Sequence, residues 1–255
     1  MAAVEIERND RVGIIRLNRP EARNAVNGEL ATGVEAALDE FETDAGIQAV
    51  VLTGNGSTFC AGADLKLVAT GRGAEMATAK GNFAGVVRRV YSKPLIAAVN
   101  GPALAGGFEI VLSCDLVVAA DHAIFGLPEV KRGLFAAAGG LLRLPQRIPL
   151  ATATELAITG DPIDATRAHQ LGLVNQVVPA DQVMDAALAL AARIAANGPL
   201  AIKNTLTMVR EAGDLGEEAG WTRNFELAME VFASKDSIEG ATAFAEKREP
   251  RWTGT

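Results

Sequence analysis

The chain has 255 residues, of which 49% are hydrophobic and 22% are charged, and its formal net charge at pH 7 is −7. These values are typical of a globular protein, and a chain of this length can bury most of its apolar surface, which excludes a mainly disordered state. Its acidic balance and scattered Lys and Arg residues lack the basic surface of a nucleic-acid-binding protein. We therefore expect no nucleic-acid partner.

Cysteines, histidines and apolar runs narrow the class of protein further. Cys60 and Cys114 show neither the spacing of a disulfide framework nor that of a zinc site, and the chain has only two histidines. We therefore expect two buried thiols and no metal site. The acidic start MAAVEIERND has no apolar signal core, and the longest apolar run, residues 110–120, is interrupted by Asp115. These features predict a cytoplasmic protein with no membrane partner.

The amino-terminal stretch predicts a hairpin that leads into a strand–helix–strand unit. Apolar and polar side chains alternate over VEIERNDRVGIIRLN on both sides of Asn9-Asp10, which is typical of two antiparallel strands joined by a turn. Asn27 can cap a helix, because apolar residues then recur at helical spacing as far as Phe41. QAVVLTG follows and predicts a buried strand.

Strand and helix patterns continue to alternate up to about residue 120, which predicts an α/β core. We expect a helix around residues 75–90, the strand PLIAAVNG, a short helix after Gly106 and the strand DLVVAA. After about Leu150 the pattern becomes mainly helical, with helices predicted at ATATELAIT, DATRAHQLG, DQVMDAALALAARIAAN, PLAIKNTLTMVREAG and SIEGATAFAEKREP, and one strand at LVNQVVP. No Ser- or Gly-rich linker divides the chain, so we expect one domain with a helical appendage.

Three common site motifs are incomplete in this sequence. GNGSTF has Phe59 at the third glycine position of a dinucleotide-binding turn, and GPALAGG has Gly107 where a P-loop has its lysine. No serine lies in a GxSxG turn, and no motif connects His122 or His169 to a nucleophile. Nucleotide hydrolysis and serine-hydrolase chemistry are therefore unsupported.

Three glycine-rich turns follow predicted strands, where α/β proteins build their sites. They are GNGSTFCAGADL, NGPALAGGFEI and FGLPEVKRGLFAAAGG. The small residues around Ala63 and Gly106 allow backbone N–H groups to approach a ligand closely, and Gly106 falls at a predicted helix start. Two such amides would form an oxyanion hole. The alternative interpretation is that these glycines only permit tight turns.

The order and spacing of five segments resemble the crotonase, or enoyl-CoA hydratase/isomerase, superfamily. These segments are LNRPEARNAV, FCAGADLK, PLIAAVNGPALAGGFE, FGLPEV and EGATAFAEKREPRW, and together they span nearly the whole chain. The resemblance implies an α/β spiral of repeated ββα units with a helical C-terminal trimerisation region. We expect residues 1–195 to form the core with an acyl-CoA site and residues 196–255 to form the oligomerisation region.

The resemblance also implies the catalytic groups. The amides of Ala63 and Gly106 would hold the thioester oxygen of an acyl-CoA, and Glu109 and Glu129 would be the catalytic carboxylates. Hydrogen bonds to that oxygen stabilise an enolate, and hydration also needs one group that takes a proton from water and one that delivers a proton to C2. We assign these roles to Glu109 and Glu129 respectively. In a shared apolar pocket at least one of them should have a raised pKa, whereas each taken alone could be an exposed carboxylate.

Substrate contacts are also implied by the resemblance, and no added cofactor is, because coenzyme A is part of the substrate. Lys66, and Lys247 from a neighbouring subunit, are candidates for the CoA phosphates, although both could be solvated surface lysines. The backbone near Ala22 and Ala25 would line the adenine and pantetheine channel. Further predicted substrate contacts are Ala61, Asp64, Leu65, Phe108 and Ala137. Four residues would line the acyl pocket or belong to the core: Phe108, Leu127, Phe135 and Leu141.

The loop after Glu129 departs from the commonest family pattern. Ala136-Ala137 stands where many relatives have Pro-Gly, and Lys131-Arg132 places two cations that can lower the pKa of Glu129. The segments GGFE, GGLLRLP and EGATAFAEKREPRW resemble a carnitinyl-CoA dehydratase branch, which uses the same pair of glutamates.

Our leading hypothesis is an enoyl-CoA hydratase or dehydratase that works as a homotrimer or a dimer of trimers. The alternatives are a carnitinyl-CoA (crotonobetainyl-CoA) dehydratase, a Δ3-Δ2-enoyl-CoA isomerase, an acyl-CoA-binding protein without turnover, and a purely structural trimer. One carboxylate would suffice for the isomerase, so the presence of both Glu109 and Glu129 favours the hydratase.

Overall fold

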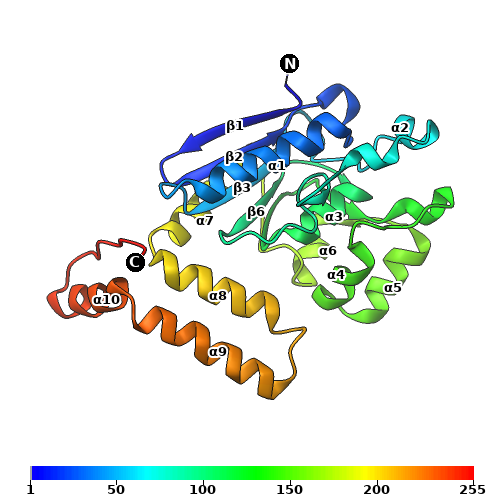
Figure 1. The fold of residues 1–255 in the computed structure, drawn as a ribbon. Coiled ribbons are helices and arrows are strands. Elements are labelled where there is room, and N and C mark those ends of the chain that lie inside the picture. The colour runs from blue at the N-terminus through cyan, green and yellow to red at the C-terminus, as the bar shows by residue number, and fades with distance from the viewer. Residues whose placement is uncertain (1) are drawn as a thin grey trace.

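The computed structural model describes residues 2–255 and has a six-stranded sheet at its centre. The strand order is β1-β2-β3-β6-β8-β11; β1 and β2 pair antiparallel, and every other neighbouring pair is parallel. The strands are Val4–Asn9 (β1), Val12–Leu17 (β2), Ala49–Gly54 (β3), Leu95–Val99 (β6), Leu116–Ala120 (β8) and Gln176–Val178 (β11). Helices lie against this sheet (Figure 1), so the central strands are buried.

The opening hairpin and the first helix confirm the sequence prediction. β1 and β2 are joined by a two-residue turn, with Asn9 opposite Val12. Helix α1 (Gly28–Thr43) begins where Asn27 accepts a hydrogen bond from the Leu30 amide at 2.9 Å. Its predicted apolar stripe is buried: Leu30, Val34, Ala37, Leu38 and Phe41. These contacts anchor α1 on the sheet.

Smaller elements surround the central sheet. A three-stranded sheet, in the order β10-β9-β7, contains Ala103–Leu104 (β7), Ile124–Gly126 (β9) and Ile163–Asp164 (β10), and Ala77–Thr78 (β4) pairs with Asn82–Phe83 (β5). The α-helices after α1 are Leu65–Ala69 (α2), Gly106–Ser113 (α3), Gly140–Arg147 (α4), Leu150–Thr159 (α5), Ala165–Gln170 (α6), Val183–Ala195 (α7), Pro199–Glu211 (α8), Glu217–Phe232 (α9) and Lys235–Glu246 (α10). Four 3₁₀ helices are Pro20–Ala22 (η1), Gly73–Met76 (η2), Pro128–Arg132 (η3) and Ala180–Gln182 (η4).

The helix predicted around residues 75–90 was wrong. The segment instead contains the end of η2, the β4–β5 pair and turns, with Asn82 and Gly85 at φ values of 57° and 71°. A carboxylate on α1 holds it, because Glu35 Oε2 accepts hydrogen bonds from Thr78 Oγ1 at 2.5 Å and from the Gly81 amide at 2.8 Å. These long-range contacts and left-handed residues override the local helical spacing.

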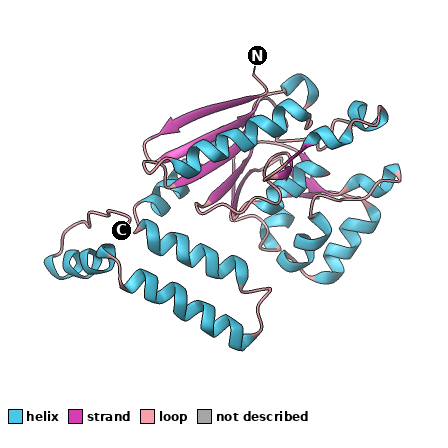
Figure 2. Ribbon diagram, in the orientation of Figure 1, coloured by secondary structure: helices cyan, strands magenta, loops and turns pink. Residues whose placement is uncertain are grey.

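Helices α8, α9 and α10 extend from the body of the molecule at the carboxyl-terminal end (Figures 1 and 2). Helix α9 was not predicted, because only Leu227 of its apolar residues is buried and no clear core-facing stripe marks the helix in the sequence. Asn204 on α8 donates to the Leu227 carbonyl at 3.0 Å, and Arg210 reaches back to Asp115 at 2.7 Å. These polar contacts join the helices to each other and to the body.

Both predicted thiols, Cys60 and Cys114, are buried and unpaired, which confirms that expectation. Within residues 2–255, no helix combines the length and the apolar character needed to cross a membrane.

Candidate functional site

Two backbone segments that follow β3 and β6 lie directly against each other. The Leu104 amide donates to the Cys60 carbonyl at 3.0 Å. A Cβ atom on Gly101 would lie 2.2 Å from the Ser57 carbonyl oxygen, and one on Gly107 would lie 2.0 Å from that of Cys60. Only glycine allows this close approach. The sequence therefore places two glycine-rich turns side by side at the carboxyl ends of neighbouring parallel strands.

The close approach brings together the two amides predicted to form an oxyanion hole. A Cβ atom on Gly62, the residue before Ala63, would lie 2.8 Å from the Gly106 nitrogen. Ala105 precedes α3 with φ 52° and ψ −130°, a conformation that costs about 1–3 kcal/mol in a non-glycine residue. Among the hydrogen bonds of residues 2–255, none has the Ala63 or the Gly106 amide as its donor. Neither N–H group is therefore engaged by another part of the described chain, and Gly62 places the Ala63 segment against Gly106.

Glu109 lies on α3 one helical turn after Gly106, and its residue is 3% exposed. Its Oε1 atom accepts a hydrogen bond from the Gly140 amide at 2.8 Å. Burial raises the pKa of Glu109 to about 7; the charge of Glu129 adds to the rise, and the Gly140 amide and Arg143 oppose it. Near neutral pH this carboxyl can therefore either take up or release a proton.

Glu129 lies on η3 directly after Pro128 and is 9% exposed. Its Oε2 atom is buried and has no hydrogen-bond partner within residues 2–255. Burial raises the pKa of Glu129, and Arg132 opposes that rise, so the cation predicted to lower this pKa acts in the expected direction but is outweighed. Both glutamates therefore show the raised pKa that was predicted for at least one of them. An unpartnered buried carboxyl oxygen beside a second carboxyl group is suited to binding a reactive water.

The sequence and the fold both match known proteins. The model of the enoyl-CoA hydratase/isomerase family matches residues 7–255. The chain belongs to this family. It is 40% identical to enoyl-CoA hydratase EchA19 of Mycobacterium tuberculosis, over 99% of both proteins, and 38% identical to a carnitinyl-CoA dehydratase of Proteus mirabilis, over 94% of both. A solved enoyl-CoA hydratase structure from Mycobacterium tuberculosis matches with a TM-score of 0.96 and 50% identity, and all of both chains is covered.

These matches confirm the predicted superfamily and the crotonase-type α/β fold with its carboxyl-terminal helices. The chain is an acyl-CoA hydro-lyase of the enoyl-CoA hydratase family. Identity to the hydratase and to the carnitinyl-CoA dehydratase differs little, so the carnitinyl branch is not specifically favoured.

Several predicted acyl-CoA contacts lie along one stretch of chain. Ala61 is half-buried beside the predicted oxyanion hole, and Leu65 and Lys66 are exposed on α2. The Asp64 carboxylate is already engaged, because its Oδ1 caps α2 by accepting from the Lys66 amide at 3.2 Å and its Oδ2 pairs with Arg19 at 3.3 Å. Asp64 therefore holds the backbone of this stretch in place.

Arg19 also fixes the segment predicted to line the adenine and pantetheine channel. Its Nη1 atom donates to the Ala25 carbonyl at 2.5 Å, in addition to the pair with Asp64. Ala22 and Ala25 are both half-buried. Arg19 was not among the predicted site residues, although the RPEARNA stretch that contains it carried the family resemblance.

The remaining predicted contacts differ in position and in burial. Lys247 is exposed at the end of α10, which lies at the opposite end of the molecule from α2 (Figure 1). Phe108 is fully buried against Phe125, with ring centroids 5.6 Å apart, so its ring packs in the core. Four residues of the predicted acyl pocket and its loop differ in burial: Leu127 is buried, Leu141 is half-buried, and Phe135 and Ala137 are exposed.

Two structural contacts of the site were missed in the sequence. The Gly140 amide binds Glu109, and the GG pair in AAAGG was the available signal, because a glycine at a helix start leaves its N–H free to approach a side chain. Phe83 packs on Gly106, where an added Cβ atom would lie 2.5 Å from its ring. Phe83 fell in the segment wrongly predicted as a helix, which hid this contact.

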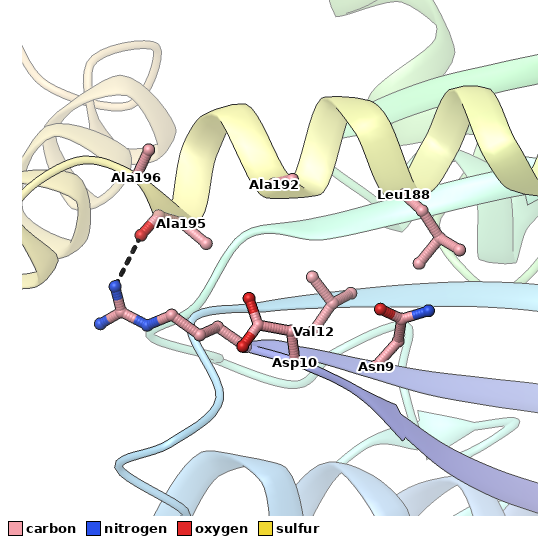
Figure 3. A pocket seen from close by; sticks show the side chains of 8 residues that line it. Asn9, Asp10, Val12, Leu188, Ala192, Ala195 and Ala196 are labelled. Atoms are coloured by element: carbon pink, nitrogen blue, oxygen red, sulfur yellow. Dashed lines mark hydrogen bonds between the residues drawn. The ribbon is translucent and has the colours of Figure 1, made fainter.

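A separate cavity of about 240 Å³ lies between the β1–β2 turn and α7 (Figure 3). It is lined by Asn9, Asp10, Arg11, Val12, Leu188, Ala192, Ala195 and Ala196. Arg11 Nη1 donates to the Ala195 carbonyl at 3.0 Å. None of these residues is a predicted catalytic or acyl-CoA contact, so this cavity is distinct from the candidate site.

Proposed function

We propose that the protein adds water to, or removes water from, the C2=C3 bond of an enoyl-CoA thioester. One observation carries this proposal: two backbone amides that find no acceptor among residues 2–255 occur in the same fold region as two buried glutamates with raised pKa values, one of them a single helical turn after Gly106. This arrangement supplies an electrophilic site for the thioester oxygen and two proton-transfer groups, which are the requirements of hydration.

The amides of Ala63 and Gly106 are the proposed oxyanion hole. They donate to the thioester oxygen, which gains negative charge as water adds to C3 and an enolate forms. Loss of one such donor typically costs about 3 kcal/mol of transition-state stabilisation. The strained Ala105 and the close packing of Gly62 support this role, because both fix the position of the Gly106 nitrogen.

The proposed division between the carboxyl groups gives Glu109 the role of base. Glu109 is oriented by the Gly140 amide and, with a pKa of about 7, is partly ionised at neutral pH, so it can take a proton from water. Glu129 has a raised pKa and an unpartnered Oε2, so in its protonated form it can deliver a proton to C2. Dehydration uses the same groups in reverse.

We also propose that residues 196–255 form the subunit contacts of a homotrimer or of a dimer of trimers. Large apolar side chains on α9 and α10 are exposed, among them Trp221 at 66%, Phe232 at 67% and Phe244 at 87%. Exposed aromatic groups in such number are typical of protein–protein contacts. In this assembly Lys247 would reach the CoA phosphates of a neighbouring subunit. Sedimentation equilibrium tests the proposal, and a monomer at micromolar concentration would contradict it.

Activity with two substrates tests the proposed reaction. The purified protein is incubated with crotonyl-CoA or with crotonobetainyl-CoA, the loss of enoyl-thioester absorbance is followed, and the products are identified by mass. Addition of water to either substrate supports the proposal, and the faster substrate identifies the branch. Binding of both thioesters without any change of mass would contradict it and favour a binding protein.

A further inference from the structure

The guanidinium of Arg143 lies beside the turn that orients Glu109. Arg143 is half-buried on α4, and its two hydrogen-bonded nitrogens donate to backbone carbonyls rather than to a carboxylate. Nη1 donates to the Ala138 carbonyl at 3.3 Å, and Nη2 donates to the Val87 carbonyl at 2.5 Å. The planar, forked geometry of arginine suits a bridge between two acceptors.

The first of these carbonyls belongs to the turn formed by residues 138–140, which we call the Glu109 turn. At one end of this turn the Gly140 amide donates to Glu109 Oε1 at 2.8 Å. In its middle, Gly139 has a φ of 99°, and a Cβ atom there would lie 2.2 Å from Arg143 Nη1. The Glu109 turn therefore contacts both the Glu109 carboxyl group and the Arg143 guanidinium.

The second carbonyl belongs to the segment beside the predicted oxyanion hole. Val87 lies four residues after Phe83, whose ring packs on Gly106, and the Val87 amide donates to the Phe83 carbonyl at 3.3 Å. Arg143 thus connects the segment that supports the Gly106 amide with the turn that supports the Glu109 carboxyl.

We propose that Arg143 is a positioning residue, which holds the Glu109 turn against the Val87 segment and so fixes the Glu109 carboxyl relative to the Gly106 amide. The inference rests on the proposed catalytic role of Glu109. It adds a second contribution from the same side chain, because the positive charge of Arg143 favours the ionised form of that carboxyl group.

The charged groups around Glu109 set the sign of this electrostatic effect. Glu129, on η3, raises the pKa of Glu109, and Arg143, on α4, lowers it. Arg143 itself faces Glu109 and a second cation of α4, Arg147, and burial lowers the pKa of Arg143. Removal of the Arg143 charge should therefore raise the pKa of Glu109 further.

The test compares Arg143→Gln and Arg143→Lys with the matched control Arg147→Gln. Arg147 lies on the same helix and also donates to a backbone carbonyl, that of Cys114 at 2.6 Å, but it does not contact the Glu109 turn. Two quantities are measured for each folded variant: the pKa of Glu109, by ¹³C NMR titration assigned with Glu109→Gln, and the pH profile of kcat with crotonyl-CoA.

We expect Arg143→Gln to raise the pKa of Glu109 by about 0.5–1 unit, since a nearby cation is lost. We expect kcat to fall about tenfold or more in both Arg143 variants, because small displacements of a reacting group are costly. Arg143→Lys keeps the charge and should leave the pKa of Glu109 near its original value, while an ammonium cannot reproduce the forked bridge. Arg147→Gln should leave both quantities unchanged.

An unchanged kcat in Arg143→Lys and Arg143→Gln would overturn the proposal, as would equal changes in Arg147→Gln. If Arg143→Gln does not fold, the comparison of Arg143→Lys with Arg147→Lys decides, because only the former should lose kcat. The NMR titration needs no turnover. If the protein is inactive toward enoyl-CoA thioesters, the proposed function fails, and the effect of Arg143→Gln on the pKa of Glu109 still tests the electrostatic contribution of Arg143.

Discussion

The two glutamates occupy regions that are built differently. Glu109 is on a regular helix, α3, and its carboxyl group is held by the Gly140 amide at 2.8 Å. Glu129 is on the short 3₁₀ helix η3, and its Oε2 atom has no partner within residues 2–255. Burial raises the pKa of both, but only Glu109 is tied to a second element. Burial thus sets the direction of both pKa shifts, whereas the positioning of each carboxyl group depends on its own neighbours.

Replacement of either carboxyl group should have the largest effect on turnover. We expect Glu109→Gln and Glu129→Gln each to lower kcat for hydration by about 10²- to 10⁴-fold, because a positioned acid or base contributes that much. Steady-state kinetics with crotonyl-CoA measure the effect. Full turnover in Glu109→Gln would show that the two-glutamate mechanism is wrong.

The pH dependence of stability tests the burial of Glu109 without any substrate. Its pKa is raised from 4.5 to about 7, so the folded state binds the proton more tightly than the unfolded chain does. Stability from this group is fully present below pH 4.5 and is lost as the pH rises through about 7. Relative to Glu109→Gln, the wild-type protein should therefore lose about 3 kcal/mol of unfolding free energy between pH 4 and pH 8.

Urea denaturation of wild-type and Glu109→Gln protein at both pH values measures this difference. Because all other titrating groups are common to the two proteins, their contributions cancel to first order. A difference that does not change with pH would mean that the carboxyl group of Glu109 titrates in the folded protein as it does in the unfolded chain.

A substitution beside Glu109 should have a smaller effect on turnover than removal of its carboxyl group. A Cβ atom on Gly140 would lie 3.0 Å from Glu109 Cγ and 3.1 Å from its Oε1, so Gly140→Ala should displace the carboxyl group. We expect kcat to fall about tenfold with little change in KM, since a misplaced base affects chemistry more than binding. Gly220→Ala on α9, where a Cβ atom would meet nothing within 4 Å, is the matched control and should keep full kcat.

The smallest effect is expected at the Glu129 region. Arg132 opposes the raised pKa of Glu129, so Arg132→Gln should raise the pKa of Glu129 slightly further, in line with the weak effect of an exposed charge, as ¹³C NMR titration assigned with Glu129→Gln would measure. Lys131→Gln is the control, because Lys131 pairs with Asp161 at 2.5 Å. A downward shift in Arg132→Gln would contradict the assigned sign.

Local patterns in the sequence predicted the elements whose buried residues recur at regular spacing. Asn27 and the apolar stripe to Phe41 located α1, and the alternation around Asn9-Asp10 located the hairpin. The prediction of a helix around residues 75–90 failed because the conformation of this segment depends on Glu35, more than 40 residues earlier in the chain. Helix α9 was not predicted because most of its apolar side chains are not buried.

The candidate site likewise contains residues that the sequence predicted and residues that it did not. Ala63, Gly106, Glu109 and Glu129 lie in turns and motifs that are visible in the sequence, and the structure brings Gly62 onto Gly106 and buries both glutamates. The groups that orient them, Gly140 and Arg143, act through backbone atoms of distant segments. For Gly140 the GG pair in AAAGG was the available signal, whereas the carbonyls that Arg143 contacts have no residue-type pattern, since any residue can supply a carbonyl.

Hydration in ¹⁸O-labelled water tests the central claim most directly. The protein is incubated with crotonyl-CoA in this water, and the mass of the product is compared for wild-type protein and Glu109→Gln. We predict that wild-type protein forms a 3-hydroxyacyl-CoA with one ¹⁸O atom at C3, and that Glu109→Gln forms it far more slowly. A product that carries no ¹⁸O, or equal rates in the two proteins, would contradict the proposed mechanism.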